Sequence, residues 1–274
     1  MTTLQQTLNP SHPPNVASIN LERFKRWLRR SIAIIGFLAL WEIAPRVGLV
    51  DGAFLPPLST VLATGVTLIG NGQLLVHVQA SLTRSLTGFL AAIACAVPLG
   101  LAIGWYKGAA ETLSPLLEML RNTTALALLP VFILLLGIGE ASKIALIIYA
   151  CSWPILLNTI TGVRNVDPLL IKSARTMGLP PLKLFYKVIL PAAVPTIFVG
   201  IRLAGAFSVL VLVAAEMVGA KAGLGYLIIY SQYNFQIPEM FLGIISITLV
   251  GLGINYLLVR LERHFSAWRV EHVH

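Results

Sequence analysis

The sequence predicts an all-α membrane protein with about six transmembrane helices. Hydrophobic residues make up 57% of the 274 residues, charged residues make up only 11%, and the mean hydropathy is +0.83. Soluble chains carry about 25% charged residues, so much of the apolar surface of this chain is expected to face lipid. The net charge of +9 does not indicate nucleic acid, because the basic residues gather at the edges of apolar runs. Basic residues in that position set topology and contact anionic lipid headgroups.

Six apolar runs approach the length of about 20 residues that a helix needs to cross the hydrocarbon layer. They cover residues 31–47, 86–106, 124–137, 144–162, 194–218 and 240–259. The third run is short and contains Pro130, so its helix could begin near Leu113 and lie partly in the interface. Two parts of the chain are expected. Residues 1–22 should form a disordered cytoplasmic tail, and residues 23–274 should form a single transmembrane domain.

Lys and Arg are distributed unevenly over the connections between these runs. Most of them flank alternate connections and the two ends: Arg23, Lys25, Arg26, Arg29, Arg30, Lys107, Arg121, Arg164, Lys172, Arg175, Lys183, Lys187, Arg260, Arg263 and Arg269. The remaining connections hold Arg46, Lys143 and Lys221. Because positive residues stay in the cytoplasm, this pattern predicts a multi-pass protein of the inner (plasma) membrane with both termini cytoplasmic.

The connection over residues 164–191, between the fourth and fifth runs, is basic and helix-prone. Asp167 can cap a helix that starts at Pro168, and Gly178 can end it with a positive φ. Pro181 then restarts the chain as a second short helix. The first helix is expected to present Leu169, Lys172, Ala174, Arg175 and Met177 to a partner or to the membrane surface. A simpler alternative is an ordinary pair of amphipathic interfacial helices.

The spacing in this connection resembles the signature loop of bacterial ATP-binding-cassette importer permeases, which reads Glu-Ala-Ala, three residues, Gly, nine residues, Ile-x-Leu-Pro. Ala174, Gly178, Leu190 and Pro191 fall on that pattern. The chain departs from it where Lys172, Ser173 and Val188 replace the usual Glu, Ala and Ile. Four further segments resemble the branch that imports aliphatic sulfonates, taurine, nitrate and bicarbonate: residues 135–143, 153–159, 162–168 and 223–225.

This resemblance implies the type I importer (MetI-like) permease fold in a homodimer with the pore between two copies. It also implies two separate ATPase subunits and a periplasmic or lipid-anchored binding protein. The implied substrate is a small oxyanion, best matched by an aliphatic sulfonate, with taurine, nitrate and bicarbonate as alternatives. The residues implied in ATPase coupling are Asp167, Lys172, Ala174, Arg175, Gly178, Leu190 and Pro191.

Charged residues inside apolar runs are costly and are therefore functional candidates. Arg202 lies near the middle of the fifth run and Glu216 near its outer end, on the same helix face but too far apart to pair. Arg84, beside the second run, is a candidate partner for Glu216. Arg202 is interpreted either as a pore cation that attracts an anion or as a structural hydrogen-bond donor. Asn158 and Ser208 could line a polar path or join helices.

Other function classes have less support. The chain is not expected to be an enzyme or to bind ATP, because it lacks the Gly-x4-Gly-Lys-Ser/Thr spacing of a phosphate loop. Cys95 and Cys151 have no metal-ligand spacing and are interpreted as small buried hydrophobes, so no metal or cofactor is expected. A membrane-embedded enzyme would need paired carboxylates or histidines inside the runs, and a secondary transporter often shows inverted repeats. Neither signal is evident, and either class would act without an ATPase.

Overall fold

The computed structural model describes residues 32–265, and it divides into two compact units, one ending at Leu62 and one starting at Ala63. In the first unit, residues 32–46 form a helix that corresponds to the predicted first span. The Glu42 carboxylate accepts hydrogen bonds from the backbone N–H of Ser59 and from its hydroxyl, both at 2.9 Å. These bonds hold the following segment against the helix. The predicted tail, residues 1–22, lies outside the described residues.

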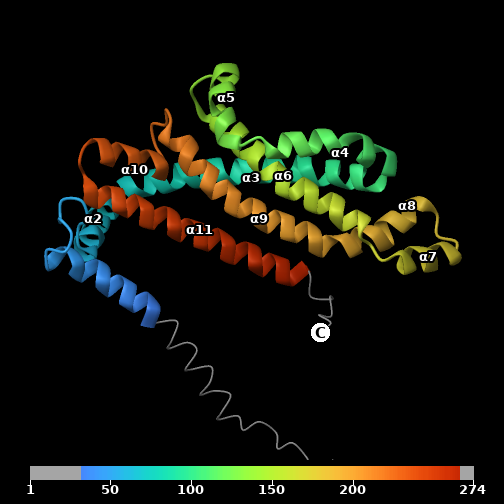
Figure 1. Ribbon diagram of the computed structural model, residues 1–274, viewed down its shortest axis with the longest axis horizontal. Helices are drawn as coiled ribbons and strands as arrows, with labels where there is room; N and C mark the ends of the chain where they lie inside the picture. The colour runs from blue at the N-terminus through green and yellow to red at the C-terminus, as the bar shows by residue number, and fades with distance from the viewer. Residues whose placement is uncertain (1–31, 266–274) are drawn as a thin grey trace, which may run out of the picture. The chain divides into compact units, whose positions relative to one another are not determined.

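Four helical segments of the second unit are long and apolar enough to cross a membrane. They are α3 (Gln73–Trp105), α6 (Glu140–Arg164), α9 (Leu190–Met217) with the turns that precede it, and α11 (Ile237–Phe265). These helices lie side by side, with α3, α6 and α9 making the central contacts (Figure 1). The short helix α10 (Leu224–Tyr233) lies at one end of this bundle and α7 (Pro168–Thr176) at the other (Figure 1). Helix α2 (Leu58–Gly70) crosses the boundary between the two units.

The third predicted span is a broken helix rather than a single helix over 124–137. Its parts are α4 (Lys107–Asn122), the 3-10 turn η1 (Ala125–Leu128) and α5 (Leu129–Leu136), and the two arms meet at an angle of 83°. The break falls at Thr123 and Thr124, which have extended backbones. Threonine is β-branched and is a poor helix former. Counting this bent pair as one span gives at most five spans among the described residues of the chain.

Two of the long helices begin well before the apolar runs that predicted them. Helix α3 was expected from residue 86 but begins at Gln73, so it also contains His77 and Arg84. The fifth span was expected from residue 194, but α8 (Pro181–Leu184), the π-helical turn η2 (Phe185–Ile189) and α9 form one continuous segment, Pro181–Met217. The apolar runs did not include these turns because the turns contain polar residues. The backbone nevertheless continues through them into the helix without a break.

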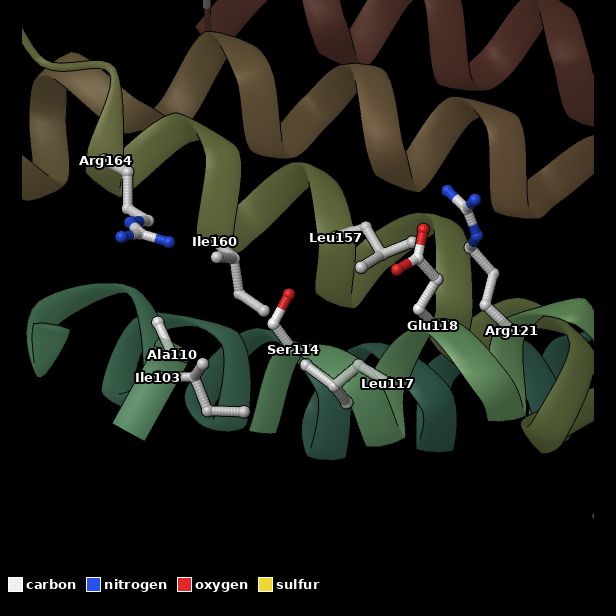
Figure 2. Close-up of a pocket in the computed structure, with 9 residues that line it drawn as sticks. All are labelled: Ile103, Ala110, Ser114, Leu117, Glu118, Arg121, Leu157, Ile160 and Arg164. Atoms are coloured by element: carbon white, nitrogen blue, oxygen red, sulfur yellow. The ribbon is translucent and has the colours of Figure 1, made fainter. Parts of the chain in front are cut away.

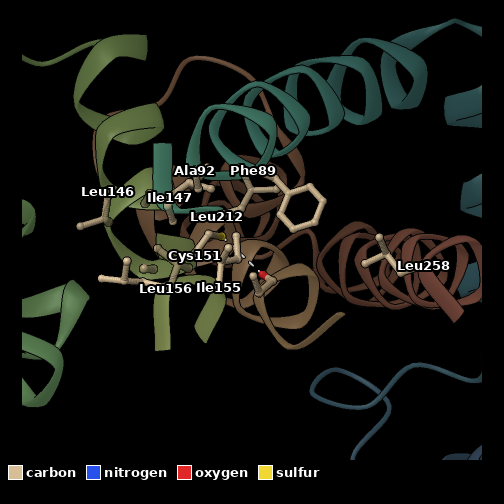
Figure 3. Packing of buried hydrophobic residues seen from close by; sticks show 14 of the residues in the cluster. Phe89, Ala92, Leu146, Ile147, Cys151, Ile155, Leu156, Leu212 and Leu258 are labelled. Atoms are coloured by element: carbon tan, nitrogen blue, oxygen red, sulfur yellow. Dashed lines mark hydrogen bonds between the residues drawn. The ribbon is translucent and has the colours of Figure 1, made fainter. Parts of the chain in front are cut away.

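Buried apolar side chains from α3, α6 and α9 form the main core (Figure 3). The labelled members are Phe89, Ala92, Leu146, Ile147, Cys151, Ile155, Leu156 and Leu212, with Leu258 from α11. A Cβ on Gly88 would stand 2.7 Å from Ile147 Cγ2, so a glycine is needed where α3 and α6 cross. Close packing over small residues is typical of membrane helices.

The two cysteines differ from each other in burial. Cys151 is buried as predicted, with its thiol 3.4 Å from the carbonyl oxygen of Ala204. The same prediction was wrong for Cys95, which is exposed. It lies off the face of α3 that buries Ala92 and Ala96, because one residue turns a helix by about 100°.

Candidate functional site

The connection between α6 and α9 folds as its sequence predicts at its first helix. The Asp167 side chain accepts a hydrogen bond from the backbone N–H of Leu169 at 2.8 Å, so it caps α7, and Pro168 occupies the first turn. Gly178 follows with φ 75°, and its N–H donates to the carbonyl of Arg175. A left-handed residue directly after a helix is the usual glycine C-cap. Both ends of α7 are therefore fixed by local sequence.

Helix α7 has an inner face and an outer face. The side chains of Leu169 and Met177 are 68% and 72% exposed, and Lys172 and Arg175 are also exposed. Ala174 was expected on this outer face, but it is only 2% exposed. It packs in a second apolar cluster with Val163, Val166, Leu184, Ile189, Ala193 and Ile197. The correction follows from helix phase, because Ala174 lies on the same side as the half-buried Ile171.

The second half of the connection is part of a long helix. The prediction of a second, separate short helix was wrong, since α8 and η2 lead into α9 without a break. Leu190 is half-buried and Pro191 is exposed at the start of α9. The loop is thus one short helix hinged at Gly178 onto the end of a long one.

A buried ionic cluster lies at the opposite end of the bundle. Arg84 on α3 is 5% exposed, and its Nη1 donates to Glu216 Oε1 and to the carbonyl oxygen of Ala222, both at 2.6 Å. Its Nε and Nη2 donate to the two carboxylate oxygens of Glu140 at the start of α6. The pairing of Arg84 with Glu216 agrees with the partner expected from the sequence. One guanidinium therefore links α3, α6, α9 and the loop before α10.

Glu216 is fully buried, and its carboxylate is surrounded by donors. Besides Arg84, it accepts from the Ser81 hydroxyl at 2.8 Å and from the Gly225 N–H at 2.9 Å. Gly223 has φ 131°, and a Cβ there would stand 2.4 Å from Glu216 Cδ. Only glycine fits this position. A buried charge is tolerated when it is paired and its remaining lone pairs accept hydrogen bonds.

The cluster also fixes the start of α10. The backbone N–H of Leu224 donates to the Ser81 hydroxyl at 2.8 Å, and that of Gly223 donates to His77 Nδ1 at 3.1 Å. Lys143 donates to the carbonyls of Gly139 and Gly219. The sequence reasoning did not assign Ser81, His77, Glu140 or Lys143 to this site. A signal was present for Glu140 and Lys143, which are charged residues at the very edge of an apolar run.

The other proposed pore residues do not come together with this cluster. Arg202 Nη1 lies 3.1 Å from Glu262 Oε2 on α11, and the exposed fractions of the two side chains are 40% and 19%. This ion pair favours the structural interpretation of Arg202. Ser208 is buried between α3 and α9, where it accepts a hydrogen bond from Ser85. Asn158 donates to the carbonyl of Pro154 in its own helix and faces Gly200 of α9.

A groove of about 220 Å³ runs between α3, α4 and α6 (Figure 2). Arg164, at the end of α6 that leads to α7, lines one end of the groove, and Arg121 lines the other (Figure 2). Between them stand apolar side chains, together with Ser114 and Glu118. Two guanidinium groups at the ends of one groove give it a basic character that the sequence reasoning did not assign.

Long apolar helices, a capped helix at one end and a buried ionic cluster at the other are features of a helical membrane protein. A family model described as the inner membrane component of binding-protein-dependent transport systems matches residues 88–270. The chain belongs to this family of ABC importer permeases. As such, the permease is a multi-pass membrane protein whose system includes an ATPase and a binding protein as partners. The permease itself is not the catalytic subunit.

Several relatives are similar over most of their length. The permease is 36% identical to a putative aliphatic sulfonates transport permease of Bacillus subtilis, over 89% of this chain and 88% of that one. It is 33% identical to the taurine transport system permease of Escherichia coli, over 90% and 94% of the two chains. It is 34% identical to the nitrate import permease of Synechocystis, over 86% and 88%.

Solved structures confirm the predicted type I importer fold. The methionine ABC transporter in an inward-facing conformation matches with a TM-score of 0.61 at 19% identity, over 70% of this chain and 96% of that one. A crystal structure of an amino acid ABC transporter matches with a TM-score of 0.56 at 18% identity, over 73% and 97%. At such identities the likeness concerns the fold alone.

Proposed function

We propose that the permease imports a small oxyanion, in the first place an aliphatic sulfonate, as a homodimer whose α7 helices dock on two ATPase subunits. A periplasmic or lipid-anchored binding protein delivers the anion to the pore between the two copies. In this arrangement both termini and α7 are cytoplasmic, as the distribution of Lys and Arg predicts. ATP-driven closure of the ATPases then moves the segment from Asp167 to Leu190.

The exposed apolar surface of α7 is the observation that carries the coupling role. Leu169, Leu170, Met177 and the adjoining Leu182 expose more than half of their side-chain surface. Leu169 and Leu170 lie on α7, Met177 directly follows it, and Leu182 lies on α8, at the end of the bundle where α7 protrudes (Figure 1). An exposed apolar patch bordered by basic residues is typical of a protein–protein contact or of a helix on the membrane surface. The resemblance of the loop to that of importer permeases supports the protein contact here.

The coupling residues divide into three roles in this proposal. Asp167 and Gly178 fix the direction and length of α7 through its two caps. Lys172 and Arg175 face the ATPase directly. The remaining coupling residues, Ala174, Leu190 and Pro191, set how the helix and its hinge sit on the start of the long segment.

The choice of a sulfonate is supported by what the relatives' names share. Aliphatic sulfonates, taurine and nitrate are all small oxyanions, and taurine is itself an aliphatic sulfonate. Two of the three substrate classes thus carry the same head group. Nitrate and bicarbonate are the alternatives, and a standalone secondary transporter is the alternative mechanism.

Two measurements test this function. The tagged permease, purified from membranes of cells that express the whole system, is expected to bring down a nucleotide-binding subunit. Uptake is then measured with a panel of sulfonates, taurine, nitrate and bicarbonate, in the presence and absence of ATP. Uptake that needs no ATPase and follows an ion gradient would show a secondary transporter. ATP-dependent uptake of nitrate or bicarbonate alone would overturn the choice of a sulfonate.

A further inference from the structure

A second cavity adjoins the groove of Figure 2 and has a volume of about 340 Å³. Arg121 lines both. One wall of the cavity is the break between α4 and η1, with Arg121, Thr123 and Thr124. The other walls come from α6 and α9 and are largely apolar, including Trp153 and Leu210. Backbone that leaves the helix at membrane depth is found where it is buried in protein or lines a cavity.

Among the described residues, Arg121 has no acidic partner, in contrast to Arg84 and Arg202; Arg164 at the far end of the groove has none either. Arg84 pairs with two carboxylates and Arg202 with one. Within the described part of the chain, no carboxylate lies within ion-pairing distance of Arg121, and Glu118 one turn earlier is also beyond that distance. Arg121 stands about 21 Å along the axis of α4 from its first residue. From the sequence Arg121 was placed in a connection, but the structure puts it near the end of the first arm of the bent pair that can form one span, with its side chain exposed beside the cavity. A charged residue within a spanning segment is a functional candidate by default.

Trp153 supplies a second donor at the same cavity. Its indole Nε1 is buried and has no hydrogen-bond partner among the described residues. Buried donors without a partner are rare in folded proteins. The nearby Tyr149 ring meets Trp153 edge-on, and the Tyr149 hydroxyl donates to the carbonyl of Leu120 at 2.8 Å. The Leu120 carbonyl near the end of α4 therefore has a hydrogen-bond partner. The guanidinium of Arg121 and the indole N–H of Trp153 remain available to a ligand.

We propose that this cavity is a substrate-binding site inside the permease, and that it takes a small organic anion with an oxyanion head and a short aliphatic chain. Arg121 and the Trp153 N–H bind the oxyanion, and the walls from α6 and α9 contact the chain. This assignment rests on the proposed import of an oxyanion. It favours an alkanesulfonate over nitrate or bicarbonate, neither of which has an apolar part to fill the far wall.

The groove of Figure 2 continues the same path toward the α7 end of the bundle. Arg121 stands where the two cavities meet, and Arg164 lines the groove near the end of α6 (Figure 2). An anion that leaves the cavity therefore passes from one guanidinium to the next. Arg202, engaged with Glu262, is not on this path. In this proposal Arg121, and not Arg202, is the cation that attracts the substrate.

The experiment measures ligand binding to the full-length permease, purified with its ATPase subunits in lipid nanodiscs. Methane-, ethane- and butanesulfonate and nitrate are titrated calorimetrically. For the unchanged permease, affinity is expected to rise about fourfold for each added methylene and to be weakest for nitrate. Arg121→Gln is expected to weaken sulfonate binding about 10- to 100-fold, the usual effect of losing a charged hydrogen-bond partner. Trp153→Phe keeps an aromatic ring, loses the N–H, and is expected to weaken it about 3- to 10-fold.

Two further variants guard against misfolding as an explanation. Arg121→Lys keeps the charge but loses the planar fork, so it is expected to bind better than Arg121→Gln. Arg260→Gln is the matched control, because Arg260 is exposed on α11 and lies over the ring of Tyr256. It is expected to bind like the unchanged permease. The thermal stability of each complex without ligand is measured alongside.

The outcomes separate this inference from the proposed function. ATP-dependent sulfonate uptake by the unchanged complex supports the function. If Arg121→Gln then binds and transports sulfonates normally, the site is wrong while the function stands. If affinity rises with the length of the sulfonate's alkyl chain but is the same in Arg121→Gln, the cavity binds only the alkyl chain. That result would overturn the proposed oxyanion site. If the unchanged complex imports nitrate and no sulfonate, the substrate choice and the apolar half of the site fail together.

Discussion

The two ends of the helical bundle are held by opposite kinds of contact. At the α10 end, Arg84 and Glu216 are buried and joined to four elements by hydrogen bonds of 2.6 to 2.9 Å. At the α7 end, Ala174 and its neighbours pack through apolar contacts, and the outer face of the helix is exposed. Directional bonds in a buried cluster allow few arrangements, whereas apolar contact is non-directional. The α10 end therefore has few alternative arrangements, whereas the contacts at the α7 end allow small shifts, as the proposed docking of an ATPase requires.

The largest expected effect comes from breaking the fixed end. Glu216→Ala removes the buried carboxylate that pairs with Arg84, so the buried guanidinium loses this partner. Removal of one member of a buried ion pair lowers the free energy of unfolding by about 3–5 kcal/mol. The unfolding temperature of the purified protein should fall sharply. Glu140→Ala is the matched control, because the Glu140 side chain is 61% exposed and pairs with the same guanidinium. Glu140→Ala should lower the unfolding temperature clearly less than Glu216→Ala does. Equal losses would mean that burial does not distinguish the two carboxylates.

At the movable end, Gly178→Val is expected to alter coupling more than folding. The left-handed backbone at φ 75° costs a side-chain-bearing residue about 1–2 kcal/mol, and a β-branched side chain is the least suited to it. The protein should still reach the membrane, but ATP hydrolysis should no longer be coupled to transport. Gly178→Asn should retain coupling, because asparagine tolerates this conformation. Normal coupled hydrolysis in assembled Gly178→Val complexes would count against a docking role for the bend.

Arg202→Gln tests a region between the two ends. If the pair with Glu262 is structural, Arg202→Gln and Glu262→Gln should each lower thermal stability, and the double variant should lose less than the sum of the two. Partly exposed pairs contribute about 0–1 kcal/mol, so the shifts should be small, and the double-mutant cycle isolates the pairwise part. Uptake should fall only in proportion to stability. A stable Arg202→Gln complex with strongly reduced anion uptake would restore the pore interpretation of this arginine.

The smallest expected effect concerns Lys172, which is exposed on α7 where the family usually has a glutamate. A surface ion pair contributes about 0–1 kcal/mol. Lys172→Ala should therefore weaken assembly with the ATPase only slightly, and Lys172→Glu should weaken it more if the facing groove is acidic. The affinity between the purified permease and its ATPase gives the measurement. Tighter assembly of Lys172→Glu would exclude an acidic groove.

Local features of the coupling loop were predictable from the sequence. Asp167 before Pro168 and Gly178 at the far end act within a few residues, so their spacing is enough to place both caps of α7. The partnership of Arg84 with Glu216 was also accessible, because two opposite charges at the edges of apolar runs need each other. These predictions depended on short-range rules or on the cost of an isolated charge.

The remaining features depend on contacts that no local pattern specifies. The partner of Arg202 is Glu262, which belongs to another helix far along the chain and lies beyond the sixth apolar run. The sequence could not show whether this region forms a short straight span or a helix bent by 83° at Thr123, because hydropathy depends on composition and not on the direction of the helix axis. Ala174 lies on the same side of α7 as Ile171. That this side is the buried one depends on Leu184 and Ile189 of the following segment, which pack against it. Each case required knowing how distant helices pack.

Helix α9 joins the two ends of the bundle. Its 28 residues span about 42 Å along the axis, and Glu216, the residue before its last, belongs to the buried ionic cluster. The π-helical turn η2 and Pro195 interrupt regular α-helical bonding near its other end. A tilt of about 7° about Glu216 displaces the Leu190 end by roughly one helical turn. In the coupling proposed above, an ATPase at α7 acts on this end of α9, so a small rotation there is enough to move the whole helix.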